Sequence, residues 1–279
     1  MCGRFAATID PARLAEEIGA LDETAGAGVR PPNYNVAPTT DILAVVARHD
    51  DPNRRTGAQR PGIGDRRTGA QRPGIGDDDP ATRRIRLMRW GLLPPWAKPG
   101  PDGTVPTRGR LLINARAETV TTSPAYRSSA QHKRCLVPMD GYYEWMPTAE
   151  SPADAGPKAR KTPFYIHSAD SRPLLVAGLW SVWKPDHTAA PLLTCTVITT
   201  DAVGALARIH DRMPLVLGAA DWDRWLDPDR PAPAGLLAAA PDISGIVVRE
   251  VSTLVNRVAN NGPELIAPAE HGNQPVGLF

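Results

Sequence analysis

The chain has 279 residues, 42% of them hydrophobic, and a formal net charge of +2 at pH 7. That length and apolar content suffice for a hydrophobic core, and the absence of an 18-residue apolar run excludes a membrane-spanning helix. Arg4 and Asp10 interrupt the first ten residues, which contain no apolar segment typical of a secretory signal peptide. We therefore expect a cytoplasmic protein.

The first predicted element is a helix over residues 13–18, because Asp10-Pro11 is a typical cap followed by a proline in the first turn. Further helices are expected over 201–209 and 219–226. Branched and aromatic residues predict strands over 42–47, 85–90, 135–137, 164–167, 174–180, 192–199 and 247–251. Many strands with few, irregularly placed helices favour an α+β fold. We expect one domain over residues 2–279, with a largely antiparallel, twisted, barrel-like sheet and flanking helices.

Two segments are expected to lie outside this core. Residues 54–65 recur identically at 66–77, and each copy has three arginines and one aspartate. The two copies carry a charge of +4, which leaves −2 on the rest of the chain. With almost no apolar side chains, residues 54–79 are expected to form a disordered insert; a basic arm that touches DNA phosphates is the alternative. Residues 148–161 are expected to form an exposed loop.

The three cysteines are Cys2, Cys135 and Cys195. An odd number without CxxC spacing argues against a disulfide framework or a zinc site, so we expect no metal and no cofactor. Cys135 and Cys195 stand in apolar, strand-like runs and are expected to be buried packing residues.

Cys2 could have a different reactivity from the other two cysteines, because it follows the initiator Met1. Aminopeptidases remove Met1 before a small residue, which would leave an exposed α-amine beside a thiol. An α-amine has a pKa of about 7.7–8.0, so a substantial fraction is neutral and nucleophilic in the cytoplasm. The amine can form an imine with an aldehyde, and the thiol can close the imine to a thiazolidine ring.

Polar and aromatic residues gather with glycine in several short blocks along the chain. In order, these blocks read MCGRF, NVAP, RWGLLPPW, INARAET, DGYYEW, IHDRMPLVL and NRVANNGPELI. In order and spacing they resemble the SOS-response-associated peptidase (SRAP) family, the abasic-site processing proteins that form DNA–protein crosslinks. The resemblance covers nearly the whole chain apart from the insert and the loop.

The resemblance implies four catalytic residues. Cys2 would condense with the aldehyde of an abasic site in single-stranded DNA and close the thiazolidine. Glu144 would move protons, for which a carboxyl group with a pKa near neutrality is useful. His210 would assist opening of the sugar ring, and Asn114 would orient the amine or the sugar.

The resemblance also implies DNA contacts. Arg4 and Arg116 would grip phosphates, which a guanidinium binds in bidentate geometry. Gly3 would let DNA approach the backbone, and Trp96 would stack on a base beside the lesion. A related protein carries a second tryptophan where this chain has Ala97, which puts recognition of a strand junction in doubt. The loop beside Cys2 would be shaped by Asn35 and Pro38.

Three functions follow as hypotheses. The first is a DNA-repair enzyme of the SOS response, a nucleoid-associated monomer that protects abasic sites beside replication-fork proteins; strand cleavage by a lyase reaction is a side activity. The second is a cysteine peptidase or N-terminal-nucleophile amidohydrolase, whose only cleaved bond could be that of Met1, with His210 as base. The third is a non-covalent single-stranded DNA-binding module.

Overall fold

The computed structural model describes residues 2–28, 30–50, 81–106, 111–148 and 161–269. The insert expected at 54–79 and nearly all of the loop expected at 148–161 lie outside these residues. Within the described part, no helix is long and apolar enough to cross a membrane.

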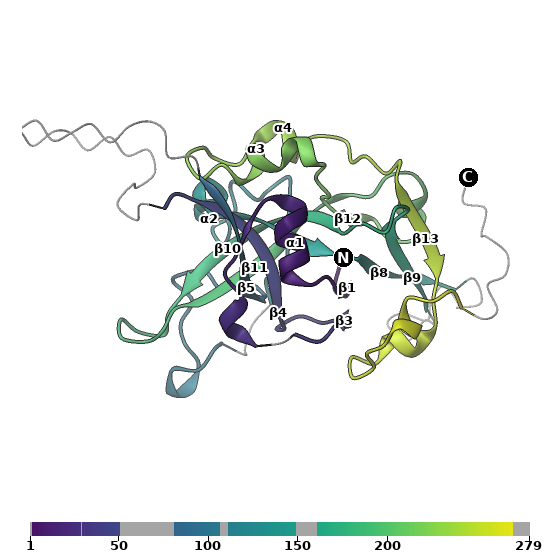
Figure 1. The fold of residues 1–279 in the computed structure, drawn as a ribbon, viewed down its shortest axis with the longest axis horizontal. Coiled ribbons are helices and arrows are strands. Elements are labelled where there is room, and N and C mark those ends of the chain that lie inside the picture. Colours follow the sequence, from purple (N-terminus) through teal and green to yellow (C-terminus); the bar gives the residue numbers. More distant parts are fainter. Residues whose placement is uncertain (1, 29, 51–80, 107–110, 149–160, 270–279) are drawn as a thin grey trace, which may run out of the picture.

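The elements are mainly strands, with a few short helices between them (Figure 1). The strands are β1 (Phe5–Ala7), β2 (Leu21–Asp22), β3 (Asn33–Val36), β4 (Asp41–Arg48), β5 (Thr82–Trp90), β6 (Asn114–Arg116), β7 (Arg134–Met139), β8 (Gly141–Pro147), β9 (Lys161–Ser168), β10 (Leu174–Trp183), β11 (Leu192–Asp201), β12 (Arg212–Pro214) and β13 (Ile246–Glu250). The α-helices are α1 (Pro11–Ile18), α2 (Arg127–His132), α3 (Trp222–Leu226) and α4 (Ala234–Leu237).

Five strands close into a barrel. The order β11-β10-β7-β4-β5 is antiparallel throughout, and a short parallel pairing of β11 with β5 completes the ring. β12 and β6 extend β11, and β2 extends β5. The prediction of an α+β fold with a largely antiparallel, barrel-like core is therefore confirmed.

The two faces of the barrel carry separate apolar clusters. Side chains alternate across a strand, so Leu43 and Val45 point to one face while Ala44 and Val46 point to the other. The first face packs against helical residues such as Leu14 and is the outside of the barrel. The second cluster fills the interior and contains Cys135 and Cys195, both fully buried as predicted.

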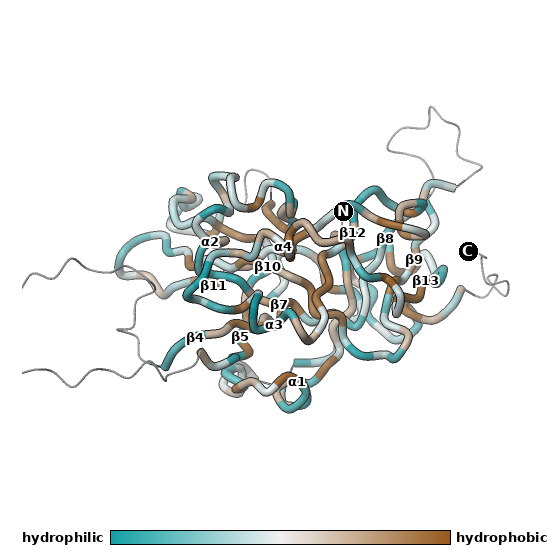
Figure 2. Tube along the Cα trace, turned by 90° about the horizontal axis from the view of Figure 1, so that it is seen from above, coloured by the Kyte–Doolittle hydropathy of each residue, from teal (hydrophilic) through white to brown (hydrophobic). Residues whose placement is uncertain are grey.

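The second sheet has the order β13-β9-β8-β1-β3 and lies beside the barrel in both views (Figures 1 and 2). Phe5 of β1 packs edge-on against Trp90 at the end of β5, with ring centroids 5.0 Å apart. This contact joins the sheet to one end of the barrel. The N-terminal strand is thereby held between the two halves of the core.

The helix predicted after Asp10 is confirmed as α1. The Asp10 carboxylate accepts hydrogen bonds from the backbone of Ala12 and Arg13, and Gly19 ends the helix with φ of +62°. Leu14 and Ile18 are its buried residues. The predicted strands all coincide with β4, β5, β7, β9, β10, β11 and β13, and the helix expected over 219–226 is found as a 3₁₀ turn followed by α3.

The helix predicted over residues 201–209 is wrong. β11 continues to Asp201, which pairs with Arg212 of β12, and only Gly204–Arg208 form a 3₁₀ helix. Two features compete with an α-helix here. Strand pairing holds Asp201 in an extended conformation, and Gly204 adopts φ of +55°, outside the right-handed helical region.

Candidate active site

Cys2 lies at the end of the barrel where the second sheet joins it. Its side chain is fully buried among apolar residues that include Phe5 and Trp90. Burial, and next the charge of Glu144, raise the pKa of the thiol well above its usual range. The sequence-based expectation of an exposed aminothiol therefore needs correction: in this fold the thiol is enclosed by apolar side chains.

Asn114 holds the backbone of Cys2. Its Nδ2 donates a hydrogen bond of 2.8 Å to the Cys2 carbonyl oxygen. β6 places Asn114 beside Val197 of β11, and its own carbonyl accepts a bond of 3.0 Å from the Tyr126 hydroxyl. The Asn114 Oδ1 is buried and has no hydrogen-bond partner among the described residues. An acceptor is thus left open next to Cys2.

Glu144 and Tyr142 face Cys2 from β8. The two residues stand two apart on one strand and so share a face. Glu144 is 4% exposed; burial raises its carboxyl pKa, and the charge of His210 acts in the opposite direction. Burial, then the charges of Cys2 and Glu144, raise the pKa of Tyr142. The charge interactions among Cys2, Tyr142 and Glu144 indicate that these three side chains are close together.

His210 is half-buried in the loop before β12. Its Nδ1 lies 2.9 Å from the backbone N–H of Arg212 and 2.7 Å from a carboxylate oxygen of Asp211. A ring nitrogen can accept the first contact only when unprotonated and donate in the second only when protonated. The two neighbours therefore favour different proton positions on the His210 ring.

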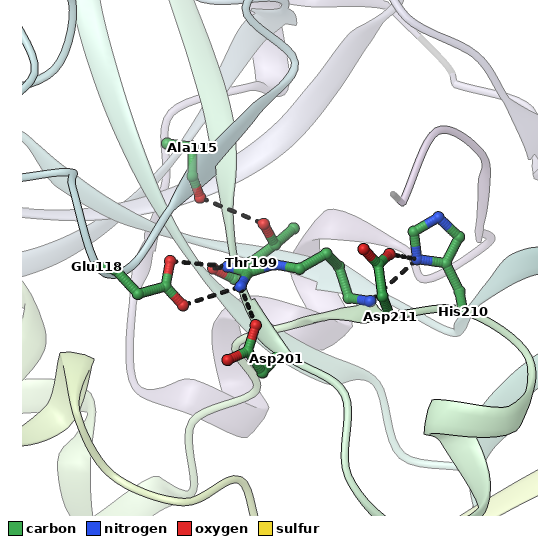
Figure 3. Close-up of polar contacts among 7 residues, drawn as sticks. Ala115, Glu118, Thr199, Asp201, His210 and Asp211 are labelled. Atoms are coloured by element: carbon green, nitrogen blue, oxygen red, sulfur yellow. Dashed lines mark hydrogen bonds and ion pairs between the residues drawn. The ribbon is translucent and has the colours of Figure 1, made fainter.

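Arg212 fixes the loop that carries His210 (Figure 3). Its guanidinium forms a bidentate pair with Glu118, at 2.9 Å for both oxygens, and also bonds Asp201 and the Thr199 carbonyl. Arg212 is 7% exposed. The IHDRMP block is thereby locked to the INARAET block across the sequence.

The structure brings together the four residues predicted to be catalytic: Asn114 bonds Cys2, the charge of Glu144 acts on Cys2, and His210 acts on Glu144. A buried carboxyl and a histidine near the Cys2 thiol can move protons to and from a carbonyl compound, and the Asn114 amide can orient it by hydrogen bonds. No group of three or more metal-binding side chains occurs in the part of the chain that the structure describes.

The residues expected to bind DNA fall into two groups. Trp96 is 67% exposed, and Arg116 at the end of β6 is also exposed. Arg4 is partly committed within the protein, because its Nη1 donates to Asn35 Oδ1 and to the Val255 carbonyl, at 2.7 and 3.0 Å. Trp96 and Arg116 are therefore accessible to a ligand, whereas Arg4 already has hydrogen-bond partners within the protein.

Asn35 is buried and binds the C-terminal block. Its Nδ2 donates to the carbonyls of Arg257 and Asn260, at 3.0 and 2.9 Å. Gly3 and Pro38 are partly exposed on either side of this contact. Asn35 thus has a structural role, tying the NVAP block to residues 255–260.

Three residues of the site were not singled out from the sequence. Tyr142 could have been found, because it stands two residues before Glu144 within a predicted motif. Glu118 and Arg212 also stand in predicted motif blocks, but no sequence signal pairs them, since 94 residues separate them.

Comparison with known proteins finds relatives that match nearly the whole chain. The family model described as SOS response associated peptidase (SRAP) matches residues 1–258. The Bacillus subtilis "Abasic site processing protein YoaM" is 33% identical over 273 residues, covering 97% of this chain and 100% of that protein. "Abasic site processing protein YoqW" from the same organism is 34% identical over 268 residues, covering 95% and 99%.

More distant similarity extends to a vertebrate protein and to solved structures. "Abasic site processing protein HMCES" of Xenopus tropicalis is 33% identical over 209 residues, covering 68% of this chain and 58% of that protein. A crystal structure of a Bacteroides thetaiotaomicron protein shares the fold, with a TM-score of 0.68, 20% identity and coverage of 96% and 100%. A match over 258 residues, and relatives that align from end to end, establish that the chain belongs to the SRAP family.

Proposed function

We propose that this protein captures abasic sites in single-stranded DNA as a covalent thiazolidine crosslink through Cys2, once Met1 has been removed. The observation that carries the proposal is that Asn114 and Glu144 act on Cys2, while His210 acts on Glu144, from three distant segments of the chain. The relatives named as abasic site processing proteins support the same substrate.

The reaction balances with the loss of one water. The neutral α-amine of Cys2 adds to the aldehyde of the ring-opened sugar, and the resulting carbinolamine loses water to give an imine. The thiol then adds across the C=N bond: sulfur bonds to carbon, and the thiol proton ends on nitrogen. No oxidant, reductant or metal is needed.

The raised pKa values suit this order of steps. A protonated Cys2 thiol does not compete with the amine for the aldehyde, so imine formation comes first. Glu144, whose carboxyl pKa is raised by burial, can protonate the leaving hydroxyl and then accept a proton from the thiol. The open acceptor at Asn114 Oδ1 fits an amine or sugar hydroxyl.

The test uses mature protein and an oligonucleotide with one abasic site. The expected product survives a denaturing gel and has the summed mass of protein and DNA less one water. Cys2→Ala keeps an α-amine without a thiol, so it should give only an imine, which borohydride traps and which otherwise dissociates. Cys135→Ala removes another buried cysteine and should crosslink normally. The mechanism would be refuted if Cys2→Ala, without borohydride, gave an adduct that survives the denaturing gel with the summed mass of variant and DNA less one water.

A general cysteine peptidase is less well supported. Thiolate nucleophiles in such enzymes have lowered pKa values, whereas burial and Glu144 raise that of Cys2. A single cleavage that frees the Cys2 amine remains compatible with the site. Repeated turnover of unrelated peptides by the mature protein would favour the peptidase instead.

A further inference from the structure

A pair of cations flanks one buried indole at another part of the barrel. The Arg48 guanidinium carbon lies 4.5 Å, and the Lys133 ammonium nitrogen 5.6 Å, from the ring centroid of Trp180. Trp180 is 3% exposed, whereas Arg48 is exposed and Lys133 half-exposed. The backbone N–H of Trp180 donates to the Lys133 carbonyl at 2.9 Å, which fixes this neighbourhood.

These two cations have no carboxylate partner within the residues that the structure describes. Their neighbours Arg84 and Arg86 do: Glu23 bonds both, and Asp50 bonds Arg84. Although the Arg48 side chain is largely exposed, burial of its guanidinium, followed by repulsion from Arg86, lowers its pKa, and the charge of Glu23 only partly opposes this. Burial, followed by repulsion from Arg48, lowers the pKa of Lys133. A bound anion would therefore be attracted by both cations.

The cations occupy the barrel end opposite to Cys2. β4 runs from Asp41, which pairs with Arg89 next to Trp90, to Arg48, which pairs with Thr82. Since Phe5 packs against Trp90, the length of β4 separates that contact from Arg48. Its seven residue steps correspond to roughly 23 Å at about 3.3 Å per residue. The cluster thus lies outside the candidate active site.

We propose that Arg48 and Lys133 form a second phosphate-binding site that holds a nucleic-acid strand at a distance from Cys2. The proposal rests on the proposed function for its choice of ligand. Phosphate contacts of this kind position a strand without reading its sequence. A single strand that reaches both ends of the barrel would gain affinity from both sites, whereas a strand too short to span them would not.

The test is the binding of intact, lesion-free single-stranded oligonucleotides to Arg48→Gln/Lys133→Gln, measured by fluorescence anisotropy. Loss of two phosphate contacts should lower the salt slope, the change in log affinity with log salt, by about 1.4, at about 0.7 per phosphate. The ratio of wild-type to variant affinity should therefore fall about seven-fold between 50 and 200 mM salt. A strand of three nucleotides, too short to span the two sites, should show a much smaller difference than a thirty-nucleotide one.

Arg13→Gln/Arg172→Gln is the matched control, because it removes two exposed arginines that line a different surface. It should leave the salt slope unchanged. Thermal melting of both variants verifies that they fold. An equal loss in both variants, or no loss in Arg48→Gln/Lys133→Gln, would overturn the proposal.

Inorganic phosphate distinguishes a free anion from a strand. If phosphate raises the melting temperature of wild type but not of Arg48→Gln/Lys133→Gln, and oligonucleotide affinity is the same for both, the assignment to nucleic acid is overturned. Lesion-free DNA keeps this test separate from the proposed function. If wild type fails to crosslink but the salt slope still differs between wild type and Arg48→Gln/Lys133→Gln, only the proposed function is wrong. If wild type crosslinks but the salt slope does not differ, only the second phosphate site is wrong.

Discussion

Arg212 and Glu118 form a bidentate ion pair in which both nitrogen–oxygen distances are 2.9 Å. The pair joins the strand that follows His210 to the segment that follows Asn114. Because Arg212 is buried and also bonds the Thr199 carbonyl, its geometry restricts where His210 can lie. An ion pair between two exposed side chains contributes little to stability, but in this pair the Arg212 side chain is buried.

Glu118→Gln should destabilise the protein by about 1–2 kcal/mol, a value reduced because the Glu118 side chain is 46% exposed. Its hydrogen bonds to Arg212 lower the pKa of Glu118. A lowered carboxyl pKa gives stability that is present above the unfolded pKa and lost as pH falls through the folded one. Chemical denaturation from pH 7 to pH 3 should thus show a smaller loss in the variant than in wild type.

Glu144→Gln should have the opposite signature. Burial raises the carboxyl pKa, so ionisation costs stability as pH rises through the folded value. The variant should gain stability over wild type at pH 8 and lose that advantage at pH 4. Crosslink formation should slow by about 10²-fold or more, the usual size of general acid–base catalysis. A variant that crosslinks at the wild-type rate would remove Glu144 from the mechanism.

Asn114→Ala should slow crosslinking at least about ten-fold and cost about 1 kcal/mol of stability, because the Cys2 carbonyl loses its donor. Asn261→Ala is a suitable comparison: it removes bonds to the Tyr34 N–H and the Pro32 carbonyl. Rates from gel time courses should separate the two variants even where their melting temperatures agree.

Trp96→Ala should weaken binding of single-stranded DNA about 5- to 150-fold, corresponding to about 1–3 kcal/mol per stacked base. Its side chain is 67% exposed, so unfolding free energy should change by less than about 0.5 kcal/mol. Leu21→Ala, at another exposed apolar residue, should leave affinity intact. Equal affinity of Trp96→Ala and wild type would exclude a stacking role.

The sequence predicted seven of the longer strands because each carries enough branched residues to identify it alone. It did not predict β8, whose GYYEWMP sequence has no branched residue. β1, β3, β6 and β12 are only three or four residues long, and their strand conformation comes from pairing with distant segments. Residues 201–209 have the local composition of a helix, yet pairing of Asp201 with Arg212 overrides it. Local pattern cannot report such pairings.

The candidate site shows the same division. The motif blocks pointed to Cys2, Asn114, Glu144 and His210, which the fold gathers at one end of the barrel. Burial of Cys2 was not foreseeable, because it depends on Phe5 and Trp90 meeting across 85 residues of chain. Likewise, the commitment of Arg4 to Asn35 appears only in three dimensions.

The enclosure of Cys2 has a consequence for the order of events in the cell. Cys2 leaves the ribosome first, whereas β8 and the loop before β12 are synthesised much later. The apolar surroundings of Cys2 are therefore complete only after the C-terminal half of the chain has been made. A truncated chain that ends before β8 would leave the Cys2 side chain without its buried setting.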